Sequence, residues 1–475
     1  MRTLNKLSRR HSRWLVPAIL ASGGSLFLVE DAQAAGFATA RFGGEHGHPT
    51  TENATAIYYN PAGIAEDSPD LEEKDWRVKV FVDGTLALRW ASWSHVASAT
   101  DATEPAGKPA ANSGEATLFN VATAPMIGAT FQIENFGFGL GFFVPFGGAS
   151  SWDKNEAYQD DPDFAGPYDG PQRWHTIDGT LRSLYISAAA AYDILDRVSI
   201  GASFNMIRSE VNTVRAREPS GSNSVSGEGR ALIDVNGWNA SFGVGVIGEV
   251  AKNKVWIGMS YQSQPGLGDM ALNGTLDSNY GGNTSQDNIK LIQALPDIFR
   301  LGVRARPIKT VEMRVFGDYT NWGTFKSQCI IPEAADDCPV NEDGSTVEGT
   351  ENPPLVNIVR NWGPSFGIRG GGSYWVVPEI ELFLGGGYDS NAVPDSTLEP
   401  ALTDFQKASL AGGLRFQVGQ TFAMALSYTH LFYIERDTAG ESVLPELQQP
   451  SRTPDAGGQY NQTIGVINTN IQLSF

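Results

Sequence analysis

The sequence predicts an all-β fold, a 14-stranded antiparallel transmembrane β-barrel with an N-terminal plug inside its lumen. Three observations predict this fold. A secretion signal is followed by no transmembrane helix, apolar and polar residues alternate with a period of two, and the connections alternate between short and long. The composition agrees, because 53 glycines and 10% aromatic residues, with 18% charged residues, favour strands and turns.

Residues 1–34 have the features of a signal peptide. A basic start precedes an apolar stretch from Trp14 to Val29, and Ala32-Gln33-Ala34 supplies a small-residue cleavage site. After Ala35 no apolar run reaches the roughly 18 residues that a transmembrane helix needs. A closed β-barrel is then the only structure that would let this exported chain span a membrane, because lipid cannot satisfy open backbone hydrogen bonds.

The alternation is clear between Thr421 and Glu435. Even-numbered residues such as Phe422 and Met424 are mostly large and apolar, whereas odd-numbered ones such as Ala423 are mostly small or polar. A period of two places the two sets on opposite faces of a sheet. The same pattern predicts fourteen strands, near 76–93, 115–133, 135–149, 180–193, 197–212, 236–250, 254–272, 293–306, 310–325, 360–376, 379–389, 406–417, 421–435 and 460–475.

The connections between these strands predict the orientation. Tight turns such as Glu134-Asn135 alternate with long polar segments near 94–114, 150–179, 213–235, 273–292, 326–359, 390–405 and 436–459. Barrels of the bacterial outer membrane have short periplasmic turns and long extracellular loops. We therefore expect an outer-membrane protein with both termini in the periplasm. The final strand ends in Phe475, like the signal that barrel-assembly machinery recognises.

Tryptophans near strand ends are typical of the aromatic girdles at the two membrane surfaces. The tryptophans expected there are Trp76, Trp90, Trp93, Trp238, Trp256, Trp322, Trp362 and Trp375.

Residues 35–75 precede the first strand and do not alternate. They contain too many Ile, Tyr and Phe residues for a disordered tail, so we expect them to pack inside the lumen as a plug. Residues 76–475 then form the barrel.

The sequence of the plug and of the barrel resembles the FadL family of outer-membrane transporters for hydrophobic compounds. The resemblance rests on Ala35-Gly36-Phe37, Asn60-Pro61-Ala62-Gly63, Leu295-Pro296-Asp297, Tyr319-Thr320-Asn321-Trp322, Tyr388-Asp389-Ser390 with Val393-Pro394, and Tyr428-Thr429-His430.

The resemblance implies a fourteen-stranded barrel closed by an N-terminal hatch. Asn60, Pro61, Ala62 and Gly63 would belong to the hatch, and a kink in the third strand would open the wall sideways. The corresponding residues are Pro145, Phe146, Gly147 and Gly148. Pro145 cannot donate a ladder hydrogen bond, although a proline here is also compatible with a simple strand end.

Several charged residues fall on the lumen face of the predicted strands. The cations are Arg300, Arg304, Arg306, Arg314, Arg369, Lys407 and Arg415, and the anions are Glu312, Asp318 and Glu381. One interpretation is an ion-pair ladder that neutralises itself. The other is that some cations meet the carboxylate of a ligand, with Arg300, Arg304, Arg314 and Arg415 as the candidates.

The two cysteines, Cys329 and Cys338, lie in one long extracellular segment, so we expect a local disulfide. Their spacing is unlike a zinc site, and we expect no metal, cofactor or catalytic residue. The net charge of -19 argues against nucleic acid as a partner. The expected partners are a hydrophobic small molecule, outer-membrane lipid and lipopolysaccharide, and the assembly machinery, with the protein itself a monomer.

The resemblance implies passive uptake of hydrophobic compounds, with long-chain fatty acids expected and aromatic hydrocarbons as the alternative. The ligand would bind in an apolar lumen pocket, the hatch would rearrange, and the ligand would leave at the strand-three kink. A lipid-modifying enzyme is a second class, but it needs a Ser-His pair, and no serine partner for His430 stands out. A general porin or structural barrel is the third, although a porin would not need the apolar hatch.

Overall fold

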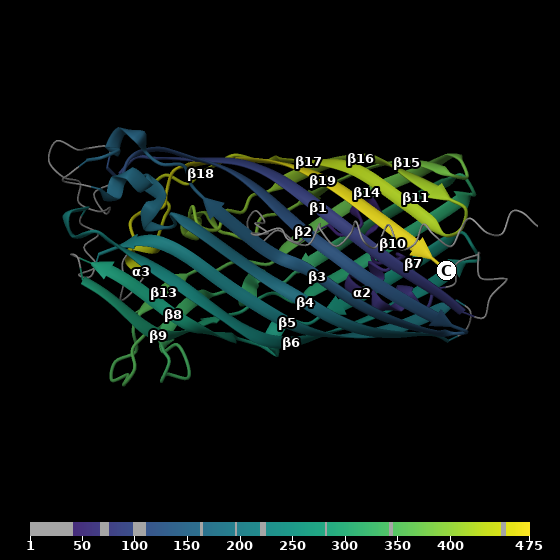
Figure 1. The fold of residues 1–475 in the computed structure, drawn as a ribbon, viewed down its shortest axis with the longest axis horizontal. Helices are drawn as coiled ribbons and strands as arrows, with labels where there is room; N and C mark the ends of the chain where they lie inside the picture. Colours follow the sequence, from purple (N-terminus) through teal and green to yellow (C-terminus); the bar gives the residue numbers. More distant parts are fainter. Residues whose placement is uncertain are drawn as a thin grey trace, which may run out of the picture. The chain divides into compact units, whose positions relative to one another are not determined.

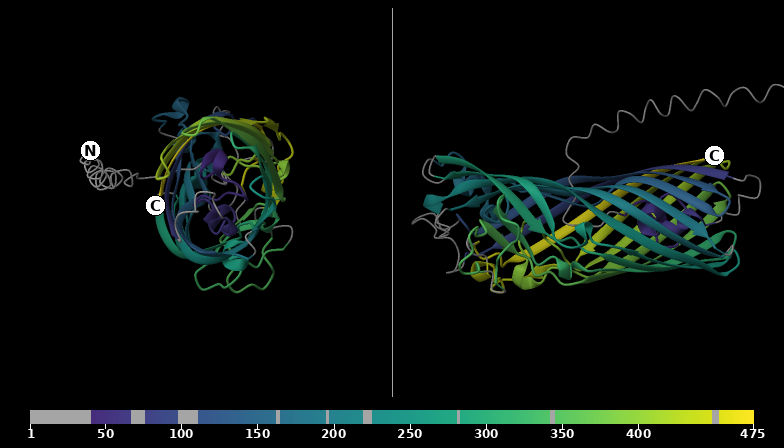
Figure 2. Two further views of the ribbon diagram at one scale, coloured as in Figure 1. Left: turned by 90° about the vertical axis from the view of Figure 1, so that its right-hand side faces the viewer. Right: turned by 90° about the horizontal axis from the view of Figure 1, so that it is seen from below.

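The computed structural model describes residues 41–66, 76–97, 111–161, 165–194, 197–218, 225–280, 283–341, 345–447 and 453–475. The predicted signal peptide, 1–34, and Ala35-Gly36-Phe37 lie outside these residues. Within them, fourteen antiparallel strands form a barrel that closes where the first strand pairs with the last (Figures 1 and 2). In barrel order the strands are β1 (Trp76–His95), β2 (Gly114–Ile133), β3 (Phe136–Ser151), β4 (Asp178–Asp193), β5 (Val198–Arg217), β6 (Gly229–Ala251), β7 (Val255–Gln262), β10 (Ile298–Ile308), β11 (Val311–Thr320), β14 (Ser365–Val377), β15 (Ile380–Asp389), β16 (Lys407–Val418), β17 (Phe422–Tyr433) and β19 (Gln459–Ser474).

The predicted strand number is confirmed, and the chain closes without a register shift. The β1–β19 pairing runs from Ser94↔Gln459 to Lys79↔Ser474. The short turns that the structure describes, together with Trp76 and Phe475, lie at one end of the barrel, which we call the short-turn end. The other end carries the long connections and is called the long-loop end.

The wall is taller on one side. At the long-loop end β6 leaves β7 and pairs with a second group of strands, in the order β6–β8–β9–β12–β13. These are β8 (Met270–Tyr280), β9 (Asn283–Gln293), β12 (Ser327–Pro332) and β13 (Val356–Val359). The prediction of loops at 273–292 and 326–359 was therefore wrong. So was the single strand at 254–272, which the turn at Pro265–Leu267 divides.

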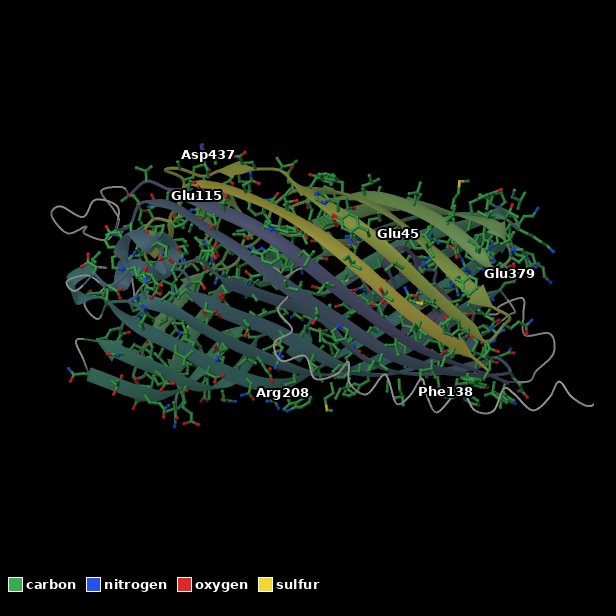
Figure 3. All side chains as sticks on the ribbon, turned by 45° about the horizontal axis from the view of Figure 1, so that its top comes forward. Glu45, Glu115, Phe138, Arg208, Glu379 and Asp437 are labelled. Atoms are coloured by element: carbon green, nitrogen blue, oxygen red, sulfur yellow. A yellow bond between two sulfur atoms is a disulfide. The ribbon has the colours of Figure 1, made fainter. Side chains whose placement is uncertain are left out.

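The outer face of the barrel is apolar all round. Each of the fourteen barrel strands exposes large apolar side chains. Phe138 on β3 is one of them, and Figure 3 shows it on the outside of the wall. Trp76, Trp90 and Trp238 are exposed, as the girdle prediction expects. That prediction was wrong for four others, because their strand parity or loop position turns them inward. They are Trp93, Trp256, Trp322 and Trp362, all buried.

Helical turns in the described residues are short. They are η1 (Gly44–His46), α2 (Ala56–Tyr59), η2 (Pro61–Ile64), η4 (Glu156–Tyr158), η5 (Gly166–Asp169), η6 (Pro171–Trp174), η7 (Val225–Gly227), η8 (Pro265–Leu267), η9 (Trp322–Thr324), η10 (Asp395–Thr397) and α3 (Leu444–Leu447), alongside the two-residue strand β18 (Arg436–Asp437). None of the helices in these parts of the chain is long and apolar enough to cross a bilayer.

A disulfide joins Cys329, on β12, to Cys338 in the connection that follows. Cys329 is fully buried beside Ile331 and Ala335, so the bond fastens this connection to the upper sheet.

Candidate functional site

Residues 41–66 fill the lumen near the short-turn end, where Figure 2 shows the purple segment inside the ring of strands. We call them the hatch. Hydrogen bonds connect the hatch to strands on all sides. The backbone N–H of Gly43 donates to Asp83 on β1 at 2.8 Å, and Gln132 on β2 donates to the carbonyl of Ala65 at 3.1 Å. On the opposite wall, Ser260 of β7 donates to the carbonyl of Tyr59 at 2.6 Å.

The Asn60-Pro61-Ala62-Gly63 element lies at the centre of these contacts. The Asn60 side chain caps η2 by accepting from the N–H of Ala62 at 3.1 Å. Its amide nitrogen lies 2.8 Å from the carbonyl oxygen of Pro49, 3.1 Å from that of Val246 on β6 and 3.3 Å from that of Met259 on β7. This one side chain thus joins the hatch turn to the barrel wall. The sequence pattern gave no indication of the two strand partners, because Val246 and Met259 are 186 and 199 residues away from Asn60.

Inward-facing glycines make room for the hatch. A Cβ atom on Gly245 of β6 would lie 1.9 Å from the Asn60 side-chain oxygen, and one on Gly201 of β5 would lie 2.4 Å from the Ala62 nitrogen. On β3, a Cβ atom on Gly137 would lie 2.8 Å from the backbone of Ile64. Such separations are far below van der Waals contact. The strands near the short-turn end are therefore shaped to fit this segment.

Directly beyond the hatch, β3 breaks away from β2. The two strands pair only from Ile133↔Phe136 to Met126↔Phe143 in the described structure. The pairing of β3 with β4 shifts register between Phe143 and Phe146, which leaves a bulge that contains Pro145. A proline has no N–H to donate, so a bulge is one of the few strand positions that it tolerates.

Beyond the bulge, β3 bends into the lumen. Val144, Gly147 and Ala149 have the outward parity, yet all are buried. Contact with β2 resumes after the strand, where the N–H of Asp153 donates to the carbonyl of Thr117 at 2.9 Å. We call the unpaired stretch between 118–125 of β2 and 144–151 of β3 the window. The kink predicted at Pro145, Phe146, Gly147 and Gly148 coincides with this bend.

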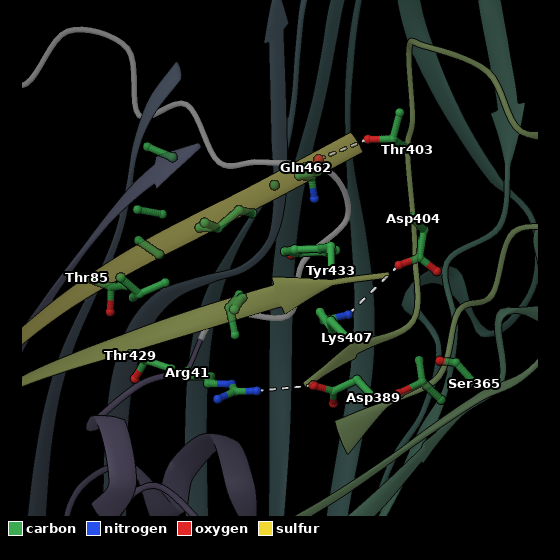
Figure 4. Close-up of a pocket in the computed structure, with 18 of the residues that line it drawn as sticks. Arg41, Thr85, Ser365, Asp389, Thr403, Asp404, Lys407, Thr429, Tyr433 and Gln462 are labelled. Atoms are coloured by element: carbon green, nitrogen blue, oxygen red, sulfur yellow. Dashed lines mark hydrogen bonds and ion pairs between the residues drawn. The ribbon is translucent and has the colours of Figure 1, made fainter. Parts of the chain in front are cut away.

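A cavity with an empty volume of about 1310 Å³ lies behind the window. We call it the window cavity (Figure 4). It reaches Ala122 and Ala124 on the β2 side of the window and Val144 and Gly147 on the β3 side. It also touches Thr123, a residue of outward parity on β2, so it extends into the wall. Its other apolar walls include Trp322, Trp362, Phe366, Leu431, Ile464 and Val466.

The charged residues of the window cavity are paired with one another. Arg369 contacts both Asp318 and Asp389, and Arg41 of the hatch lies 3.2 Å from Asp389. Lys407 is held more loosely, with its ammonium nitrogen 3.9 Å from Asp404. Three cations and three carboxylates therefore balance in this cavity. The contribution of Arg41 could not be found from strand parity, because it comes from the hatch.

The four arginines predicted to meet a ligand lie elsewhere, and the described lining of the window cavity includes none of them. Arg300 stacks over the Tyr58 ring of the hatch, with its guanidinium carbon 4.5 Å from the ring centroid. Arg304, Arg314 and Arg415 line a cavity at the short-turn end, on the other side of the hatch.

Most of these inward-facing charges pair, as the ion-pair ladder interpretation expects. Arg314 lies 3.0 Å from Glu312, and Arg415 lies 3.8 Å from Glu381. Arg304 lies 3.4 Å from Glu52 of the hatch. Burial alone would raise the pKa of Glu52, but Arg304 and Lys79 hold it at about 2. Through the pair of Arg304 with Glu52, these ion pairs also fasten the hatch to the barrel wall.

One inward-facing cation absent from the sequence-based set connects several parts of the site. Arg89 on β1 is 2% exposed and donates to three neutral oxygens. These are the side chain of Gln462 on β19 at 2.8 Å, the carbonyl of Ala149 on β3 at 3.1 Å, and the hydroxyl of Thr403 at 2.7 Å. Its inward parity was readable from the sequence, but its partners were not.

Among the described residues no group of three or more His, Cys, Asp or Glu side chains is placed to hold a metal ion. The window cavity instead combines apolar walls with balanced charges, which suits a largely hydrophobic molecule.

Comparison with known proteins agrees with this architecture. The barrel is similar in fold to a FadL homologue from Pseudomonas aeruginosa, with a TM-score of 0.68 and 14% identity over 92% of this chain and 99% of that one. It is also similar to the toluene transporter TodX of Pseudomonas putida, with a TM-score of 0.59 and 14% identity over 94% and 99% of the two chains.

A putative outer membrane protein of Neisseria meningitidis is 20% identical over 406 residues, which are 80% of each chain. The family model described as outer membrane protein transport protein (OMPP1/FadL/TodX) matches residues 16–452. The chain therefore belongs to the FadL/TodX family of outer-membrane transporters for hydrophobic compounds, and it is not an enzyme.

Proposed function

We propose that this protein lets long-chain fatty acids and similar compounds cross the outer membrane passively, by binding in the window cavity and leaving sideways through the window. The observation that carries the proposal is the break between β2 and β3, where the window cavity, with its apolar walls and balanced charges, reaches both unpaired strands. A ligand that leaves there enters the hydrocarbon layer directly and avoids water.

The orientation is part of the proposal. The short-turn end would face the periplasm and the long-loop end the cell exterior, as in other outer-membrane barrels. The hatch then closes the periplasmic side of the window cavity. The hydrogen bonds of the hatch to β1 and β7 support a lumen that is closed toward the periplasm, so a ligand in the window cavity would leave through the window rather than past the hatch.

Binding and release would use different interactions. Each ligand methylene that leaves water contributes about 0.8 kcal/mol to binding. A carboxylate would meet Lys407, because its pair with Asp404 is the loosest in the cavity. Arg41 lines the same cavity and begins the described hatch, so a rearrangement of the hatch would change the shape of the site and release the ligand.

Aromatic hydrocarbons are a second candidate. Trp322 and Trp362 both line the window cavity and pack edge to face, with ring centroids 5.1 Å apart. Such rings offer a partner for a flat apolar ligand. TodX, one of the proteins of similar fold, is a toluene transporter. Uptake of radiolabelled oleate and of toluene by cells that lack their own transporters would decide between the two ligand classes.

The test of lateral exit is to fill the window. Ala124 faces inward at the window, so Ala124→Trp places an indole in the path. We expect uptake of oleate to fall at least about tenfold, since the ring removes most of the opening. Leu140→Trp is the matched control, because Leu140 is 66% exposed on the paired part of β3. Normal uptake by a folded Ala124→Trp protein would reject the lateral route.

A general porin would behave differently in a second assay. Liposomes that contain the intact protein should swell slowly in sugars, because the hatch occupies the lumen. Rapid sugar flux would favour the porin.

A further inference from the structure

The cavity at the short-turn end, which the hatch separates from the window cavity, has no part in the proposed path of the ligand. Its empty volume of about 3130 Å³ is larger than the volume of about 1310 Å³ of the window cavity. Residues of four short turns line it, so it opens at this end of the barrel; they are Asn253, Lys309, Pro378 and Gln420. We call it the short-turn cavity. In the orientation proposed above, it opens to the periplasm.

Cationic side chains dominate the short-turn cavity. Among the described residues that line it, seven arginine and lysine side chains face three carboxylate side chains, those of Glu52, Glu312 and Glu381. This excess of positive charge stands out in a chain whose net charge is -19. A concave surface with charges of one sign focuses the electric field and attracts ions of the opposite sign. The short-turn cavity therefore favours an anionic ligand.

The few carboxylates leave several of these cations incompletely paired. Glu312 is shared, because it accepts from Arg306 at 2.6 Å and from Arg314 at 3.0 Å. Arg415 lies 3.8 Å from its carboxylate partner. Lys309, in the turn between β10 and β11, is exposed, and its side chain contacts no carboxylate among the described residues. The mouth of the cavity thus retains cations that a ligand can bind.

The hatch itself shows how an acidic peptide binds here. The backbone carbonyl of Glu52 accepts from Lys79 on β1 at 2.8 Å, and its carboxylate lies 3.4 Å from Arg304 on β10. These two strands are on opposite walls, since β10 is eighth of the fourteen in the order that begins with β1. One glutamate of a peptide chain therefore uses both its backbone and its side chain to join the two walls. A second acidic segment could bind the cations nearer the mouth in the same manner.

From this arrangement we infer that the short-turn cavity binds an acidic segment of a periplasmic protein, whose carboxylates meet Lys309, Arg306 and Arg415. The inference rests on the orientation in the proposed function and goes beyond it, because it adds a protein partner at the inner mouth of the barrel. Charge complementarity supports it, since the partner supplies the carboxylates that the cavity lacks. Thr51 and Glu52 line the same cavity, so the bound segment would lie beside the hatch.

The experiment measures fluorescence anisotropy of a labelled peptide of eight glutamates, titrated with the purified full-length protein in a nonionic detergent. We expect saturable binding that weakens as sodium chloride is added, because salt screens exposed charges. Lys309→Glu should weaken binding about tenfold, since it places a like charge at the mouth. Arg415→Gln should weaken it in the same direction.

Lys252→Glu is the matched control. Lys252 is also exposed in a short turn at this end, the one between β6 and β7, but it is outside the described lining of the cavity. Its replacement should leave the affinity for the peptide unchanged. Equal losses in Lys252→Glu and Lys309→Glu would show that the peptide follows the general surface charge, and they would overturn the inference.

Two other occupants are tested in the same assay. If inorganic phosphate displaces the peptide better than chloride at equal ionic strength, the cavity is a site for small anions and not for a peptide. Residues 67–75 carry five carboxylates and one lysine. If the peptide binds only after Asp67, Asp70, Glu72, Glu73 and Asp75 are replaced by their amides, the chain's own segment takes the place of the partner, and the inference is wrong.

The proposed function is tested separately. Lys309→Glu should bind oleate as the unchanged protein does, because the window cavity lies on the other side of the hatch. Peptide binding by a protein that binds no oleate would reject the proposed ligand and still support the inference. Oleate binding without saturable peptide binding would overturn the inference and leave the proposed function intact.

Discussion

Arg89 on β1 donates a hydrogen bond of 3.1 Å to the backbone carbonyl of Ala149 on β3, across the lumen side of the window. In a continuous sheet, this carbonyl would instead accept a backbone hydrogen bond from the neighbouring strand β2. Arg89 also donates to the hydroxyl of Thr403, which lines the window cavity, so it joins β3 to the connection that follows β15. The bend of β3 is thus maintained by a buried cation as well as by Pro145.

The first prediction follows from that bond. Arg89→Met removes three donated hydrogen bonds and lets β3 move back toward β2, which narrows the window. We expect oleate uptake to fall about tenfold, since each bond from a charged group contributes about 1.5–3 kcal/mol. Arg182→Met, on the exposed outer side of β4, should have no effect. Unchanged uptake by Arg89→Met would show that the bend does not depend on this side chain.

The second prediction concerns the hatch. Asn60→Ala removes the side chain that joins η2 to β6 and β7, so the hatch should loosen and the protein should conduct ions and sugars. Single-channel conductance and liposome swelling measure this directly. Asn53→Ala is the control, because the bonds of the Asn53 side chain to other described residues all lie within the hatch, to His46 and Thr55. Equal conductance of the two variants would contradict the anchoring role of Asn60.

The third prediction uses two glycines of one strand. Gly245→Ala places a methyl group 1.9 Å from the Asn60 oxygen, so the hatch must shift. Gly248→Ala, three residues later on β6, meets nothing within 4 Å. We expect only the first to raise the rate at which added protease cleaves the hatch. If the two variants are cleaved alike, the fit between β6 and the hatch is looser than the distances indicate.

The sequence predicted the barrel and its strand number, because lipid outside and polar residues inside impose a period of two on every membrane strand. This alternation of apolar and polar residues is imposed only on the part of a strand that faces the membrane. On β9 the apolar Ile289 and Leu291 are buried, but the strand begins with six exposed residues, Asn283 to Asn288. With polar side chains on most of its surface, such a strand resembles a loop in the sequence.

The site was less predictable, because its parts meet only in space. Parity placed Arg304 and Arg314 in the lumen, but it carries no information about depth along the barrel. In the structure they lie on the short-turn side of the hatch, which separates them from the window cavity. Arg215 lies in the segment 213–235, which the sequence predicted as a loop, whereas the structure extends β5 to Arg217 and buries the Arg215 side chain.

The fourth prediction concerns the disulfide. Replacing Cys329 and Cys338 by Ser should loosen the connection after β12 and leave the barrel folded. The two residues are nine positions apart, and closing a loop of that length contributes about 2.5 kcal/mol. Limited proteolysis should then cut this connection faster, while the mobility of unheated protein on gels stays unchanged. Loss of the folded barrel would show that the bond stabilises more than its own loop.

The last prediction concerns pH and the long-loop end. Glu399 has a pKa of about 2 in the fold and an ordinary value of 4.5, so its charge contributes stability above pH 4.5. That contribution, on the order of 3 kcal/mol, is lost as the pH falls from about 4.5 to about 2. Protonation weakens the bonds from Arg360 and His175, so the connection after β15 should open first.

Hydrogen exchange of residues 390–406 between pH 3 and pH 6 measures this opening. After correction for the intrinsic exchange rate, protection should fall at low pH in the unchanged protein. In Glu399→Gln it should be lower at pH 6 and nearly independent of pH, because the amide does not titrate. Strands β16 and β17 provide the internal reference and should stay protected throughout. If protection falls in the same way in both proteins, another group controls the connection, and the Glu399 pairs are not what holds it closed.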